Sequence, residues 1–152
     1  MKIEINSRFS GKVLFCHDCE NNTLKLTVEA AARAGAYLVG ARLDGASLVG
    51  ASLDGASLAG AYLVGARLDD KSKLKGGRPV LQIGPIGSRS SYFVAYLTES
   101  GVRLRAGCWF GTLAQFEEKL KVTHADNEHG LEYRAALVLI QKHAEIWENK
   151  KD

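Results

Sequence analysis

A five-residue period dominates the middle of this 152-residue chain. Seven consecutive units run without an insertion from Ala36 to Asp70 and read AYLVG ARLDG ASLVG ASLDG ASLAG AYLVG ARLDD. Every unit opens with alanine and carries leucine at its third position. A short fixed period of this kind is typical of a solenoid, in which each repeat packs against its neighbours. Because a period of five fits neither an amphipathic helix nor an alternating strand, we expect neither element here.

The two constant positions of each unit are expected to form the inner wall of the solenoid. Alanine and leucine are small or apolar, and they recur in register along the segment. The other positions hold Tyr, Arg, Ser, Val, Asp and Gly, which suit a solvated outer wall.

This pattern closely resembles the pentapeptide-repeat family, whose units follow A(D/N)LXX. The resemblance implies a right-handed, quadrilateral β-helix with one pentapeptide per face and four per coil, so that seven units make just under two coils. The residue before each leucine departs from the family pattern, which has Asp or Asn there. The residues at this position are Tyr37, Arg42, Ser47, Ser52, Ser57, Tyr62 and Arg67. The departure leaves the inner wall unchanged and makes the outer surface particular to this protein.

The segment before the repeats predicts a β-hairpin followed by a helix. We expect strands at Lys2–Arg8 and Lys12–Cys16, and a helix from Leu24 to Ala34 with Thr23 as its N-cap. The end of a solenoid exposes apolar side chains and unpaired backbone groups. We therefore interpret residues 1–35 as a cap.

The segment after the repeats predicts a small α+β domain. The expected strands are Val80–Ile83, Tyr92–Thr98 and Val102–Phe110, the last two joined as a hairpin. A helix should begin after Thr112 with a capping box to Gln115, and a second helix should follow a loop at His124–Gly130 and end near Asn149.

The predicted fold class is therefore mixed β-solenoid and α+β. A capped pentapeptide-repeat β-helix is followed by a strand hairpin with two helices. The predicted segments are a cap (1–35), the β-helix (36–70), a linker (71–79) and the α+β domain (80–152).

The composition predicts a cytoplasmic protein without a membrane span. No apolar run approaches the ~20 residues that a helix needs to cross a bilayer. The first residues, MKIEINSRF, lack the apolar core of a secretion signal. Three cysteines fit a reducing compartment better than a disulfide framework.

Positive charge is concentrated in one segment. The net charge is only +3, but residues 71–110 contain seven Lys and Arg against a single acid, Glu99. A local excess of this kind can attract an anionic partner. The alternative is that Lys71, Lys73 and Lys75 only keep the protein soluble, and the sequence leaves both interpretations open.

A glycine-rich turn is the first candidate binding site. Residues 84–89 read GPIGSR, in which two glycines allow close backbone approach and Ser88 and Arg89 can hydrogen-bond an anion such as phosphate. Arg103 and Arg105 are the other expected charge partners. The turn lacks the lysine and spacing of a P-loop, so no nucleotide hydrolysis is expected. A strand-to-strand turn without a ligand is the alternative.

Cys108 and two histidines form the second candidate. Together with His124 and His129, this thiol can make a nucleophile pair or a metal site, but the spacing is not diagnostic of either. Cys108 lies beside Trp109 and Phe110, where a cysteine usually behaves as a core residue. We predict ligand contacts by His124 and His129, with no catalytic residue, metal or cofactor.

A CxxC pair, Cys16-His17-Asp18-Cys19, is the third candidate. Zinc needs four ligands and no second pair is present, and a redox motif would need a βαβ context. We interpret the pair as a turn with free thiols.

The C-terminal segment also resembles tails attached to pentapeptide repeats in phage and prophage proteins. The motifs that carry this resemblance are GPIGSR (84–89), AGCWFGTL (106–113) and THADNEHGLEY (123–133). In some pentapeptide-repeat relatives, which confer quinolone resistance, a long acidic β-helix imitates duplex DNA and engages gyrase. Here the outer wall is short and mixes Arg42 and Arg67 with four aspartates, which gives such mimicry little electrostatic basis.

The sequence therefore predicts a non-enzymatic binding or inhibitor protein of phage or prophage origin. It would engage a host protein or a small anionic, nucleotide-like ligand, without direct nucleic-acid or membrane binding. A homo-oligomer, most simply a dimer, is expected because a short solenoid has edges to protect. The alternatives are an assembly protein that stacks solenoid ends, a DNA-mimicking inhibitor of a DNA-binding enzyme, and a Cys-His enzyme centred on Cys108. The predicted ligand contacts are Ser88, Arg89, Arg103, Arg105, His124 and His129.

Overall fold

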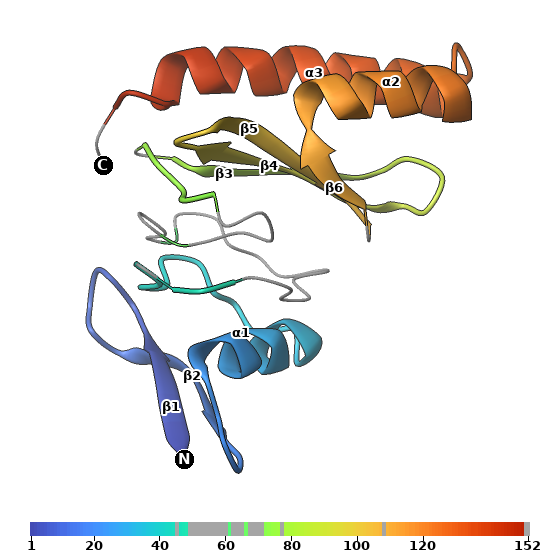
Figure 1. Ribbon diagram of the computed structural model, residues 1–152. Coiled ribbons are helices and arrows are strands. Elements are labelled where there is room, and N and C mark those ends of the chain that lie inside the picture. Colours follow the sequence, from blue (N-terminus) through green and yellow to red (C-terminus); the bar gives the residue numbers. More distant parts are fainter. Residues whose placement is uncertain are drawn as a thin grey trace. The chain divides into compact units, whose positions relative to one another are not determined.

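The structure is a computed structural model that describes residues 1–44, 46–48, 61, 66, 72–76, 78–107 and 109–150 (Figure 1). The chain divides into two compact units, Met1–Leu74 and Lys75–Asp152. The described elements are antiparallel strands and α-helices, so the mixed α and β character is confirmed. The boundaries predicted at residues 35, 70 and 79 stay predictions.

The N-terminal unit begins with the predicted hairpin. Strand β1 (Lys2–Asn6) pairs antiparallel with β2 (Val13–Asp18). β1 ends two residues earlier than predicted, because the Ser7 hydroxyl accepts hydrogen bonds from the backbone N–H groups of Phe9 and Ser10 and turns the chain. β2 begins one residue later and ends two residues later than predicted.

Helix α1 (Leu24–Arg33) follows, and its predicted N-cap is confirmed. The Thr23 hydroxyl accepts a hydrogen bond of 3.2 Å from the Leu26 N–H, which satisfies one of the free donors of the first turn. Val28 and Ala31 are fully buried on its inner side. The helix ends one residue before the predicted Ala34.

The hairpin is hydrogen-bonded to the first repeats of the same unit. The Arg8 N–H donates to the Gly40 carbonyl and the Arg42 N–H donates to the Asn6 carbonyl, both at 2.8 Å. Ser7 and Ala41 form an antiparallel bridge between these bonds. The hairpin therefore satisfies backbone groups at the start of the repeat segment, as expected of a cap.

The described alanines and leucines of the repeats point inward, with one exception. Ala36 is half-buried, and the others are buried: Leu38, Ala41, Leu43, Ala46, Leu48, Ala61 and Ala66. Tyr37, Val39, Arg42 and Asp44 are exposed on the outer side. The predicted burial of alanine and leucine is confirmed at these positions, whereas the solenoid wall itself stays a prediction. The predicted coils of residues 36–70 fall mostly outside the described residues and stay a prediction.

The C-terminal unit contains a four-stranded antiparallel sheet covered by two helices on one face (Figure 1). Its strands, in both chain and sheet order, are β3 (Val80–Ile86), β4 (Ser91–Thr98), β5 (Gly101–Ala106) and β6 (Trp109–Thr112). The helices are α2 (Leu113–Thr123) and α3 (Glu128–Trp147). Among the described residues, none of the helices combines the length and the apolar character needed to cross a membrane.

The prediction of one strand over Val102–Phe110 is wrong. The chain reverses after Ala106, and β5 and β6 pair antiparallel with Ala106 opposite Trp109. Gly107 has a φ of +60°, a left-handed conformation that glycine adopts without steric cost, and this allows the reversal. The predicted hairpin between β4 and β5 is confirmed, with Thr98 opposite Gly101.

The helix boundaries also differ from the predicted ones. α3 begins at Glu128, two residues before the end of the predicted loop, because the Asn127 side chain accepts a hydrogen bond of 2.9 Å from the Gly130 N–H. It ends at Trp147 instead of Asn149. β3 continues three residues beyond the predicted Ile83, with an irregular register.

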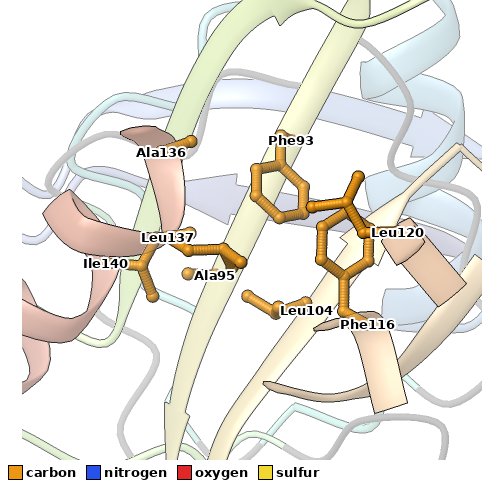
Figure 2. Close-up of a cluster of buried hydrophobic side chains, with 8 residues drawn as sticks. All are labelled: Phe93, Ala95, Leu104, Phe116, Leu120, Ala136, Leu137 and Ile140. Carbon is orange, nitrogen blue, oxygen red and sulfur yellow. The ribbon is translucent and has the colours of Figure 1, made fainter. Parts of the chain in front are cut away.

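Buried apolar side chains connect the sheet to both helices in the core of this unit (Figure 2). The Phe93 ring centroid on β4 lies 4.8 Å from that of Phe116 on α2 and 5.1 Å from that of Tyr133 on α3. Leu104 and Ile140 are fully buried in the same cluster. The buried side of each helix is an apolar stripe, formed by Phe116 and Leu120 on α2 and by Ala136, Leu137, Ile140 and Ala144 on α3.

The capping box of α2 generates the first testable prediction. The Thr112 hydroxyl accepts from the Gln115 N–H, and the Gln115 side chain accepts from the Thr112 N–H. We expect Thr112→Ala to lower the free energy of unfolding by about 1 kcal/mol, measured by chemical denaturation. Thr123→Ala makes the same change at the exposed last residue of α2 and should leave stability unchanged or slightly higher. Equal losses in the two variants would contradict a capping role.

Candidate functional site

The turn between β3 and β4 is fixed against helix α3. The Gly87 N–H donates a hydrogen bond of 2.9 Å to the Glu132 carboxylate, and the Ser90 N–H returns to the Gly87 carbonyl at 3.1 Å. Gly87 has a φ of +78°, and a Cβ atom there would overlap the Tyr133 hydroxyl. Only glycine fits this close approach, which sets the positions of Ser88 and Arg89 in the turn.

A cavity of about 240 Å³ lies between this turn, the β5–β6 turn and the two helices. Its lining residues are Ser88, Arg89, Ser91, Ala106, Gly107, Trp109, Phe116, Lys119, Leu120, Thr123, His124 and Tyr133. The aromatic rings in this wall contact one another. The Phe116 ring centroid lies 5.3 Å from those of both Trp109 and Tyr133.

The charged groups at the cavity are cationic. Arg89 and Lys119 line it together with the imidazole of His124, and no acidic residue lines it among the residues that the structure describes. The Arg89 guanidinium lies against Gly107, with one nitrogen 3.4 Å from where a Cβ would stand. The nearby Glu132 carboxylate already accepts the Gly87 N–H. The arrangement can therefore bind an anion, with Ser88, Ser91 and Thr123 as neutral hydrogen-bonding groups.

Tyr133 forms part of this electrostatic environment. Burial raises the pKa of its phenol above the ordinary value, and the negative charge of Glu132 raises this pKa further. The Arg89 cation acts in the opposite direction and lowers the pKa of the phenol. This is consistent with the cavity, which both Arg89 and Tyr133 line. Tyr133 is accordingly a neutral hydrogen-bonding group at neutral pH.

The structure brings both predicted histidines together. His124 and His129 have ring centroids 5.4 Å apart, and the His124 ring stacks on Tyr133 at 6.0 Å. The Asn127 amide nitrogen lies 3.4 Å from the Nδ1 atom of His124. His124 lines the cavity, whereas His129 adjoins it through His124.

Arg103 and Arg105 lie on the other face of the sheet. They alternate along β5 with Leu104, which is buried in the core beneath the helices. Their antiparallel partners on β4 are Tyr96 and Val94. The predicted set is therefore divided: Ser88, Arg89 and His124 line one cavity, while the other two arginines face away from it.

Sequence reasoning missed two important residues of the cavity. Lys119 lies next to the buried Leu120 on α2, at the edge of the apolar stripe. This position was the only indication in the sequence that Lys119 could line a cavity. Trp109 was interpreted as part of a continuous strand, so its place after a chain reversal could not be foreseen.

The remaining candidates give no site in the described residues. Cys16 and Cys19 are free thiols, as predicted. The predicted turn is wrong, because Cys16, His17 and Asp18 belong to strand β2 and pair with β1. Within the part of the chain that the structure describes, no three His, Cys, Asp or Glu side chains gather as metal ligands. Cys108 lies outside the described residues, so the Cys-His hypothesis has no geometry to support it.

A comparison with protein-family models matches residues 34–70 to pentapeptide repeats, in eight copies. The chain carries pentapeptide repeats. The match confirms the resemblance inferred from the alanine and leucine period, and it begins two residues before the first of the seven units. Comparisons with curated proteins and with solved structures each found no match. The cavity lies beyond the pentapeptide-repeat segment, so the match assigns it no role.

The tight fit at Gly87 gives a stability prediction. We expect Gly87→Ala to lower the free energy of unfolding by more than about 1 kcal/mol. The left-handed backbone alone would cost an alanine about 1 kcal/mol, and the new methyl group would also meet Tyr133. Gly101→Ala is the matched control, with a φ of +104° and nothing closer than an arginine nitrogen at 3.8 Å. Denaturant unfolding of both variants separates the two causes. Equal losses would show that the Tyr133 contact costs nothing.

The raised pKa of Tyr133 predicts a pH effect on stability. Because the folded state holds the phenol neutral, its contribution is complete below the unfolded pKa of about 10 and is lost as pH rises through the folded pKa. We expect the stability of the wild type to fall more steeply above pH ~10 than that of Tyr133→Phe. Thermal denaturation over this range measures the difference between the two proteins. Parallel pH profiles would contradict a perturbed Tyr133.

Proposed function

We propose that this pentapeptide-repeat protein is a non-enzymatic binding protein whose C-terminal unit takes a small anionic ligand. The observation that carries the proposal is the cavity, which Arg89, Lys119 and His124 line and to which the described part of the chain contributes no acidic side chain. Binding would rest on charge-assisted hydrogen bonds from the arginine and lysine to the anion.

The apolar part of the cavity favours a ligand that also carries a flat ring. Trp109 and Tyr133 offer aromatic surface, and Leu120 adds apolar contact. A mixed aromatic and cationic lining of this kind suits a nucleotide-like anion better than a bare inorganic ion. The hydroxyl groups of Ser88 and Thr123 would orient the ligand.

For the repeat segment, we propose the right-handed, quadrilateral β-helix. The buried alanines and leucines support it, because they occupy the positions that face inward in such a coil. The backbone bonds from Asn6 and Arg8 to the first repeats support a capped solenoid. We assign this segment the role of a scaffold.

A phage or prophage origin and inhibition of a host protein also belong to the proposal. They rest on the resemblance of the C-terminal motifs, one of which, GPIGSR, contributes Ser88 and Arg89 to the cavity. In this view, a cytoplasmic host enzyme or its nucleotide would be the target.

The test is a titration of the full chain with adenosine monophosphate, inorganic phosphate and uncharged adenosine by calorimetry. We expect the monophosphate to bind most tightly, and Arg89→Ala to weaken it by about ten- to a hundredfold through loss of a charged hydrogen bond. Arg103→Ala is the matched control, because it removes an arginine from the other face of the sheet.

Circular dichroism of both variants should match that of the wild type. No binding of any of the three compounds would remove the anion-site proposal. Equal effects of the two arginine substitutions would assign the binding to general charge instead of the cavity.

A further inference from the structure

Glu132 on helix α3 holds the turn that carries two of the cavity residues. Its carboxylate accepts the hydrogen bond of 2.9 Å from the Gly87 N–H, which lies 45 positions earlier in the chain. Ser88 and Arg89, which line the cavity, follow directly after Gly87. Because a hydrogen bond to an ionised acceptor is stronger than one between neutral groups, Glu132 fixes this end of the turn to α3.

The negative charge of Glu132 also acts on the wall of the cavity. Glu132 precedes Tyr133 in α3, and the Tyr133 hydroxyl lies against Gly87, where a Cβ atom would overlap it. After burial, the Glu132 charge is the next cause that raises the pKa of the Tyr133 phenol, and this phenol lines the cavity. The carboxylate is therefore close enough to influence a charged group that binds there.

The fixed positive charges at the cavity match a single phosphate group. Within the described part of the chain, Arg89 and Lys119 are the arginine and the lysine that line it. A phosphate monoester carries a charge of about −1.5 to −2 at pH 7, which two cations can balance. A second or third phosphate group would meet no further arginine or lysine among the described lining residues, and Glu132 would repel it.

We propose that Glu132 is a positioning and specificity-determining residue of the anion site, which selects ligands with one phosphate group over those with two or three. Its hydrogen bond to Gly87 positions Ser88 and Arg89, and its charge disfavours additional negative charge beside them. A like charge can discriminate in this way because it penalises the more highly charged ligand more strongly. The inference rests on the proposed binding of a nucleotide-like anion, and it names the charge class of that ligand.

Calorimetric titration of the full chain with adenosine mono-, di- and triphosphate tests the proposal. The three ligands share one base and one sugar and differ in negative charge, provided that the buffer contains no magnesium. We expect the wild type to bind the monophosphate most tightly. An ionic strength of about 0.1 M suits the comparison, because charges farther apart than a Debye length of about 10 Å are then largely screened.

Two substitutions of Glu132 separate its charge from its hydrogen bond. Glu132→Gln keeps an oxygen that can accept the Gly87 N–H, so it should bind the monophosphate within about threefold of the wild type. Without the negative charge, it should bind the triphosphate about three- to tenfold more tightly than the wild type does. Glu132→Ala also loses the acceptor, so it should bind the monophosphate about tenfold more weakly than Glu132→Gln.

Glu145→Gln is the matched control for the charge. It makes the same substitution on the same helix, at an exposed residue about 20 Å along α3 from Glu132. This distance exceeds the Debye length, so the ratio of monophosphate to triphosphate affinity should stay that of the wild type.

Hydrogen exchange of the Gly87 amide tests the positioning role without any ligand. We expect this amide to exchange slowly in the wild type and in Glu132→Gln, and faster in Glu132→Ala, which lacks the acceptor. Circular dichroism should show the same fold in all three proteins. Equal exchange rates in the three would overturn the positioning role.

The titrations distinguish failure of the selectivity from failure of the proposed function. A wild type that binds the triphosphate as tightly as the monophosphate would overturn the selectivity, and so would an affinity ratio that Glu132→Gln leaves unchanged. An equal change of the ratio in Glu145→Gln would assign the effect to net charge and overturn the role of Glu132. If none of the three nucleotides binds, the proposed function itself is wrong, and the selectivity is wrong with it.

Discussion

Phe93 lies at the centre of the C-terminal unit, where its ring contacts Phe116 of α2 and Tyr133 of α3. One side chain of the sheet thus positions both helices, and a buried aromatic of this size contributes several times the stability of a single surface interaction. The cavity depends on the same contacts, because Phe116 and Tyr133 also line it. The core and the cavity therefore share residues, so substitutions at the rim of the cavity are better tests of the proposed binding than substitutions in the core.

Two glycines bring the charged rim of the cavity together. Gly87 allows its turn to approach Tyr133, and Gly107 allows β6 to fold back beside β5. The Arg89 guanidinium then lies against Gly107, although the two residues are far apart in sequence. The proposed anion site is therefore built on backbone turns that glycine permits. Its specificity would come from the side chains around them, which belong to both helices and to both turns.

The basic segment of the sequence does not form a single patch. Of its cations, Arg89 lines the cavity, whereas Arg103 and Arg105 occupy the opposite face of the sheet, because alternate residues of a strand point in opposite directions. The site gains Lys119 from α2 instead, a helix outside the basic segment. The charge count along the sequence therefore identified only one of the two basic side chains that line the cavity.

The sequence by itself determined the repeats, the caps and most of the elements. The alanine and leucine period is local, and so are the Thr23 cap and the Thr112 capping box, in which neighbouring residues satisfy each other's hydrogen bonds. Only the tertiary structure decided that the chain reverses at Gly107, that Arg89, Lys119 and His124 converge, and that Arg103 and Arg105 diverge from them. These outcomes depend on which face of each strand is buried and on contacts between distant segments, and no local pattern encodes them.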